Sequence, residues 1–190
     1  MGLLRDGINE VIATTAWNAA PMGIICREKS PTMVVFRGSH TAENISRDGW
    51  VVANFLFDPV IYVETAFGDL GREHFVTEKV AGLSVQRLSE AEAWAVYSAE
   101  ISGETDEAIM VELTALYQQM LTCAVHPVNR GFSSIIEATV HATRFVQNGD
   151  PALGAWIAHH SSIVQRCGGK RELEALTRLQ QCIKKERNDP

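Results

Sequence analysis

Residues 33–46 read MVVFRGSHTAENIS, and this stretch decides the fold. An apolar, β-branched run ends at Phe36, and a short turn then leads to Ser39 and Thr41, either of which can cap a helix. The pattern predicts a strand, a turn and a short helix over residues 39–47. Free backbone N–H groups at the start of such a helix can bind a phosphate, and Gly38 would let a ligand approach the backbone closely. A plain capped helix and a phosphate site are therefore both open interpretations.

The side chains around this turn could complete a phosphate site. Ser39 and Thr41 offer hydroxyl donors, and Asn44 lies one helical turn after Thr41, so it can face the same way. Positive charge could come from Arg37 or His40, and Arg37 is the preferred fixed charge.

A second feature is NAAPMG, at residues 18–23. Pro21 cannot donate to a sheet ladder, so we expect it at a sheet edge or a bulge. Two alanines, a proline and a glycine present little side-chain bulk, and a flat aromatic ligand could lie against such a strand and bind its backbone. The alternative is an edge strand without a ligand.

The rest of the chain divides into a β-rich part and a helical part. Strands are expected over residues 9–18, 19–28, 32–38 and 49–57, a helix over 58–67, and a hairpin within 93–120 in preference to one broken helix. Helices are expected over residues 133–146, 150–167 and 170–187. Residues 1–125 carry 8 basic and 17 acidic side chains, whereas residues 126–190 carry 9 and 6. The sequence thus predicts an α+β fold with a β-rich domain over residues 1–125 and a helical lobe over residues 126–190.

Composition narrows the class of function. The 190 residues are 46% hydrophobic and 21% charged, as in ordinary folded proteins, and a net charge of −6 argues against a nucleic-acid partner. No apolar run approaches the roughly 20 residues of a membrane helix, and the N-terminus does not resemble a secretory signal. We therefore expect a cytoplasmic protein with no membrane partner. Its scattered cysteines should be reduced; they are Cys26, Cys123, Cys167 and Cys182.

The histidines form no recognised metal-binding motif. His159 and His160 are adjacent, so they should point to different helix faces, and HExxH is absent. Glu137 and His141 share a helix face, with Arg144 three residues further on, and we interpret them as an intramolecular polar network. The sequence therefore predicts no metal site.

The order of these features resembles a known fold. NAAPMG, a second strand, GSHTAEN and VVANFLFDP follow one another as in the FMN-binding split barrel, which flavin-reductase-like and pyridoxamine-oxidase-like proteins share. Within that superfamily the chain most resembles a group catalogued as a domain of unknown function, in which a helical part follows the FMN-binding barrel. HPVNRGFSSIIEATVHATR extends the resemblance into the second half. The resemblance implies an antiparallel split β-barrel, bound FMN, and a homodimer with flavin at the interface.

The same resemblance implies roles for particular residues. The flavin phosphate and ribityl chain would be lined by Ser39, Thr41 and Asn44. The isoalloxazine ring would lie beside Ala20, Pro21, Met22 and Gly23. Asn54, in VVAN, would lie on the neighbouring strand near the same pocket.

Several functions fit such a protein. As an FMN-dependent oxidoreductase it would take a hydride from a reduced nicotinamide or deazaflavin and reduce a small acceptor, so that no catalytic side chain need be assigned. As a flavin-binding module it would store, sense or deliver FMN without turnover. A third possibility keeps the fold but replaces FMN with haem or another flat cofactor.

Overall fold

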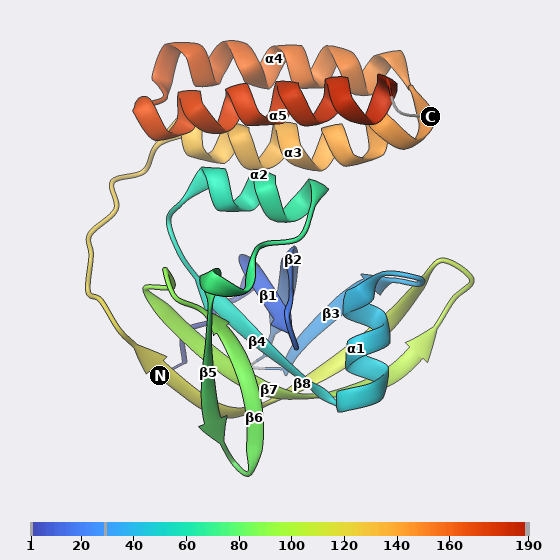
Figure 1. Cartoon of the computed structure of the whole chain (residues 1–190), viewed down its shortest axis with the longest axis vertical. Coiled ribbons are helices and arrows are strands. Elements are labelled where there is room, and N and C mark those ends of the chain that lie inside the picture. The colour runs from blue at the N-terminus through green and yellow to red at the C-terminus, as the bar shows by residue number, and fades with distance from the viewer. Residues whose placement is uncertain (1, 29, 189–190) are drawn as a thin grey trace. The chain divides into compact units, whose positions relative to one another are not determined.

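The computed structural model describes residues 2–28 and 30–188, which form two compact units (Figure 1). The first unit comprises the described residues up to Leu56 together with Leu70–Ala124. The second comprises Phe57–Asp69 together with the described residues from Val125 onward. Strands dominate the first unit and helices the second. No helix in the described part of the chain is long and apolar enough to cross a membrane.

Six strands of the described chain close into an antiparallel barrel in the order β1-β2-β3-β8-β7-β4. Their bounds are Gly7–Thr15 (β1), Asn18–Arg27 (β2), Ser30–Phe36 (β3), Trp50–Phe55 (β4), Ala93–Glu104 (β7) and Ala108–Met120 (β8). Helix α1, His40–Asp48, follows β3 directly. The predicted α+β class, the antiparallel barrel and the hairpin within residues 93–120 are confirmed.

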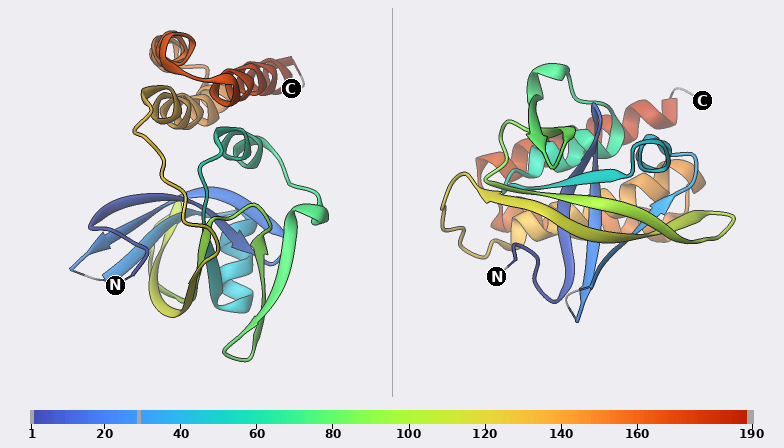
Figure 2. Two further views of the ribbon diagram at one scale, coloured as in Figure 1. Left: turned by 90° about the vertical axis from the view of Figure 1, so that its left-hand side faces the viewer. Right: turned by 90° about the horizontal axis from the view of Figure 1, so that it is seen from below.

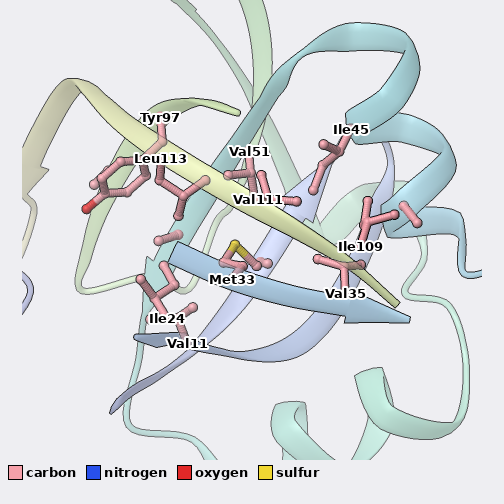
Figure 3. Close-up of a cluster of buried hydrophobic side chains, with 14 residues drawn as sticks. Val11, Ile24, Met33, Val35, Ile45, Val51, Tyr97, Ile109, Val111 and Leu113 are labelled. Atoms are coloured by element: carbon pink, nitrogen blue, oxygen red, sulfur yellow. The ribbon is translucent and has the colours of Figure 1, made fainter. Parts of the chain in front are cut away.

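The barrel is filled by alternate side chains of its strands (Figure 3). Val11, Ile24, Met33 and Val111 come from four different strands and are completely buried. Ile45, on α1, packs into the same cluster. Helix α1 is therefore fixed against the barrel by its own apolar face.

The barrel is split between β2 and β3, because these two strands pair over only part of their length. β2 pairs with β1 over Asn18–Cys26, but it pairs with β3 only over Ile24–Arg27. On its other edge β3 pairs with β8 over Thr32–Phe36, and beyond Met33 it has no partner in β2. Residues 18–23 of β2 consequently have a strand partner on one side only, among the described strands. This is the edge position predicted for Pro21.

A second, two-stranded sheet occupies residues for which no element is predicted. β5, Phe75–Val80, follows the short helix η1, Arg72–His74, and pairs with β6, Leu83–Leu88. Val80 and Val85 pack in a buried cluster with Trp50 and Trp94, on β4 and β7. The hairpin therefore belongs to the barrel unit.

The helices described in the second unit are α2, Pro59–Phe67; α3, Arg130–Asn148; α4, Pro151–Cys167; and α5, Lys170–Asn188 (Figure 2). Asp58 and Asp150 cap α2 and α4 as predicted, each accepting from a backbone N–H two residues on. Val63, Ile135, Val164 and Leu179 come from the different helices and lie in one buried cluster.

Candidate functional site

The start of α1 is a capped helix terminus. Ser39 Oγ accepts from the backbone N–H of Ala42 at 3.2 Å and donates to the carbonyl of Phe36 at 2.7 Å. Gly38 has a φ of 77°, a left-handed conformation that suits glycine. The first N–H groups of α1, those of His40 and Thr41, have no acceptor within their own helix. Ser39 therefore caps α1, and the remaining free N–H groups leave the helix N-terminus able to bind an anion.

Four polar side chains join α1 to the β1–β2 hairpin, and we call them the hairpin–helix corner: Thr15, Asn18, Thr41 and Asn44. Asn18 Nδ2 donates to the hydroxyl of Thr41 at 3.0 Å. Asn44 Nδ2 donates to the carbonyl of Thr15 at 3.0 Å and to its hydroxyl at 3.2 Å. Thr41 and Asn44 therefore do face the same way, toward the hairpin.

Arg47 fixes the orientation of one amide in this corner. Its guanidinium donates to Asn44 Oδ1 at 2.9 Å and to Asp48 at 2.6 Å. The hydrogen bond from Arg47 lowers the pKa of the Asp48 carboxyl below its usual value. Because Oδ1 of Asn44 is held by a cation, its NH₂ group is directed at Thr15.

The edge of β2 begins at this corner. Asn18 is the first residue of the edge, and the residues predicted to face a flavin ring follow it; they are Ala20, Pro21, Met22 and Gly23, all partly exposed. A strand edge without a second partner presents backbone donors and acceptors in a row. A helix terminus suited to a phosphate and an edge suited to a flat ring are therefore adjacent in the folded barrel.

Arg37 and His40, the two candidate positive charges for a phosphate, differ in their surroundings. Arg37 Nη2 pairs with Glu104 at 2.6 Å, and its Nη1 donates to the carbonyl of Thr105 at 3.0 Å. This directs the guanidinium to the turn between β7 and β8. His40 is exposed in the first turn of α1.

Asn54 is completely buried and holds three strands together. Its Nδ2 donates to the carbonyl of Ile12 at 2.9 Å and to the hydroxyl of Thr14 at 3.0 Å. Its Oδ1 accepts from the N–H of Leu88 at 2.7 Å. The amide therefore joins β1, β4 and β6, and both of its polar atoms are already used.

The structure adds residues that sequence reasoning missed. Thr15 and Asn18 complete the corner, although their partners are 23 or more positions away in the chain. Trp17, next to Asn18, is 41% exposed and lies under the guanidinium of Arg72, 5.0 Å from the ring centroid. Arg72 therefore lies beside Trp17, near the start of the β2 edge. In the sequence, the only signal for this arginine–tryptophan pair is the position of Trp17 beside NAAPMG.

Comparison with known proteins identifies related chains. The family model described as "Protein of unknown function (DUF447) N-terminal domain" matches residues 9–122, and that described as "Protein of unknown function (DUF447)" matches residues 129–181. The crystal structure of an FMN-bound DUF447 protein from Methanosarcina mazei is 33% identical, with a TM-score of 0.89, and covers 94% of this chain and 96% of its own. The matches extend over both halves of the chain, as the family resemblance implies.

Two other structures are much less similar. The 2-nitrobenzoate 2-nitroreductase NbaA of Pseudomonas fluorescens is 16% identical over 63% of this chain and 67% of its own, with a TM-score of 0.49. The flavin reductase HpaC, complexed with NADP⁺, is 11% identical over 63% and 83%, with a TM-score of 0.48. Neither likeness is close enough to support an inference about function.

Proposed function

The chain belongs to the DUF447 family, and from this membership and the geometry of its barrel we propose that it is an FMN-binding oxidoreductase. The M. mazei protein that it resembles over nearly its whole length is FMN-bound. The observation in this chain that carries the proposal is the edge of β2 at residues 18–23, which starts beside the N-terminus of α1. An isoalloxazine ring at the edge and a phosphate at the helix terminus match those two surfaces.

The residues present fit this cofactor. The N–H groups of His40 and Thr41 would hold the phosphate, and the positive end of the helix dipole would favour its charge. The hydroxyl of Ser39 would join them by turning its O–H from the carbonyl of Phe36 to the phosphate. The corner residues Thr41 and Asn44 would contact the ribityl chain. Backbone groups of residues 18–23 would hydrogen-bond the ring, beside Pro21 and its neighbours. We leave Asn54 out of these contacts because it is completely buried and its amide is held within the barrel, whereas Asn44 is only partly buried.

Bound FMN would supply the redox chemistry, taking a hydride from a reduced nicotinamide or deazaflavin donor and reducing a small acceptor. The chain's own residues would anchor the phosphate and hold the ring against the edge of β2. We place this chemistry in the cytoplasm, whose reducing conditions suit the free thiols of all four cysteines. The competing function is a flavin-binding module without turnover.

We extend the proposal to a homodimer, because the second half of β8 offers an exposed apolar surface. β3 pairs with β8 only as far as Glu112, and residues 114–120 beyond it are exposed on both faces. Leu116, Tyr117 and Met120 are 39–59% exposed there. Such a strand in a barrel is suited to cover by a second copy of the chain.

Light scattering on the protein as it elutes from a size-exclusion column measures its mass and so tests the dimer. We expect a mass of twice 20.9 kDa, and a single-chain mass for a variant with Leu116→Glu and Met120→Glu. Val125→Glu with Val128→Glu is the control, since these side chains are 91% and 98% exposed elsewhere in the chain. A single-chain mass for the parent would contradict the proposal.

Ser39→Asp is the sharpest test of the phosphate position. Aspartate is as good an N-cap as serine, so α1 should remain folded while a negative charge occupies the phosphate position. Loss of one charge-assisted contact is worth about 1.5–3 kcal/mol, which corresponds to a roughly 10- to 100-fold rise in the dissociation constant of FMN. Riboflavin, which lacks the phosphate, should bind the variant and the parent equally.

Ser133→Asp is the matched control, because it adds the same charge to the exposed first turn of α3. Flavin fluorescence titrations measure the FMN affinity of the parent, Ser39→Asp and Ser133→Asp. Equal FMN affinity for parent and Ser39→Asp would show that FRGSHT is only a turn and a cap. Donor screening then separates the two functions. Failure of both nicotinamide and deazaflavin donors to reduce the flavin of fully loaded protein would leave the flavin-binding module.

A further inference from the structure

Three potential metal ligands meet between α3 and α4 in the helical unit. Glu137 and His141 lie one turn apart on α3, and His160 lies on α4. One ligand atom of each side chain is within 4.8 Å of the other two. The spacing of histidines in the sequence hides this group, because His160 is brought to the α3 face only when the two helices pack.

The two histidines also have unsatisfied nitrogen atoms. Among the described residues, Nδ1 of His141 and Nδ1 of His160 are the buried side-chain polar atoms that have no hydrogen-bond partner. Their rings are stacked, 5.7 Å apart at 28°, so the nitrogens do not hydrogen-bond to each other across the pair. A buried polar atom without a partner is costly, and such atoms in a native structure call for an unseen ligand or water.

The surroundings of this group differ on its two sides. The ring of Trp156, one turn before His160, lies 6.1 Å from the ring of His141 and 6.3 Å from that of His160. Glu137 is exposed. The imidazoles are therefore shielded by an aromatic side chain, whereas the carboxylate is open to solvent.

We propose that Glu137, His141 and His160 bind a zinc ion, which cross-links α3 and α4. Two imidazole nitrogens and one carboxylate oxygen are a ligand set that zinc accepts, with water in a fourth position. Mg²⁺ and Ca²⁺ prefer oxygen ligands throughout. Zinc bonds of about 2.0–2.1 Å place tetrahedral ligand atoms roughly 3.3 Å apart, so the three side chains need only small rotations to close around the ion.

Calorimetric titration with ZnCl₂ tests the site on the full-length chain, freed of any affinity tag and treated with a chelator beforehand. We expect one saturable zinc ion per chain. Removing a group that merely supports a metal ligand typically costs 10- to 100-fold in affinity, so His141→Gln, His160→Gln and Glu137→Gln should each weaken binding by at least about tenfold.

His159→Gln is the matched control, because it removes an exposed histidine adjacent to His160 that is not one of the three. It should leave the zinc affinity unchanged. The exposed position of Glu137 makes Glu137→Gln the variant least able to disturb folding, and circular dichroism checks all four variants. Bound Co²⁺ should in addition give the intense visible absorption of a tetrahedral site in the parent and in His159→Gln, but not in the three ligand variants.

Three results would overturn the assignment. They are the absence of stoichiometric zinc binding, an unchanged affinity in Glu137→Gln, and a loss in His159→Gln as large as that in His160→Gln. The site lies wholly within the helical unit, so its test succeeds or fails independently of FMN binding.

Discussion

Arg37 is held at the β7–β8 turn by an ion pair that a ligand could displace. The side chains of Arg37 and Glu104 are 47% and 49% exposed, and exposed pairs of this kind contribute only about 0–1 kcal/mol. A phosphate at the start of α1 could therefore compete with Glu104 for the guanidinium. We predict that Glu104→Gln tightens FMN binding and that Arg37→Gln weakens it, as measured by flavin fluorescence titration.

Arg72→Gln is the companion variant, because Arg72 lies over Trp17 near the start of the β2 edge. If only Arg72→Gln weakens FMN binding, while Arg37→Gln and Glu104→Gln leave it unchanged, then the positive charge at the phosphate comes from Arg72.

Tyr97 should titrate at unusually high pH. Burial, followed by a smaller electrostatic effect of the neighbouring Cys26, raises the pKa of Tyr97 to about 12 from 10.0. Because the folded state favours the neutral phenol, this group stabilises the fold below pH 10, and that contribution is lost as the pH rises from 10 to 12. Tyrosinate absorbance of the parent should show a late transition that is missing in Tyr97→Phe. Identical titration curves for the two proteins would contradict this.

At the scale of elements, local sequence signals were sufficient to predict a helix start or a strand edge wherever a capping residue or a proline marks it. Ser39, Asp58 and Asp150 cap the helices predicted to start there, and Pro21 lies at the predicted edge. The β5–β6 hairpin had no such signal. Its turn places Ala81 and Gly82 at φ values of 50° and 83°, and alanine is uncommon in that left-handed conformation.

The candidate site was predictable only in part, for a related reason. The residues of NAAPMG and GSHTAEN are consecutive, so their chemistry could be read locally. The bonds that join them are not local: Asn18 meets Thr41, and Asn44 meets Thr15, only after the barrel closes. His160 and His141 likewise come together only through helix packing. Spacing in one chain cannot reveal contacts that depend on tertiary structure.

The start of helix α3 approaches the backbone at the end of α4 closely. A Cβ atom on Gly131 would lie 2.6 Å from the Cα atom of Gly168, which is backbone and cannot turn aside. We predict that Gly131→Ala lowers the free energy of unfolding by about 1–3 kcal/mol, the usual cost of overpacking. Chemical denaturation followed by circular dichroism measures it. Ser133→Ala, at an exposed position on the same helix, should have little effect, and equal stabilities for the two variants would contradict the prediction.

At the scale of the whole molecule, the chain crosses between its two units more than once. Residues 57–69 lie between two segments of the barrel unit in sequence, yet they belong to the helical unit. Val60 and Val63 of α2 are buried there among the side chains of α3, α4 and α5. Asp58 also pairs with Arg171 of α5 at 2.7 Å. A division of the chain at residue 125 would thus separate α2 from the helices that cover it.

This arrangement predicts the behaviour of a fragment ending at residue 125. Without α3 and α5, the apolar face of α2 loses its partners, and a helix of nine residues is too short to be stable alone. We therefore expect limited proteolysis to cut the fragment within residues 57–69 while the strands of the barrel survive, whereas the full-length chain resists cleavage there. Mass spectrometry of the products locates the cut. Equal resistance of residues 57–69 in both proteins would mean that residues 1–125 form an independent domain that carries α2 by itself.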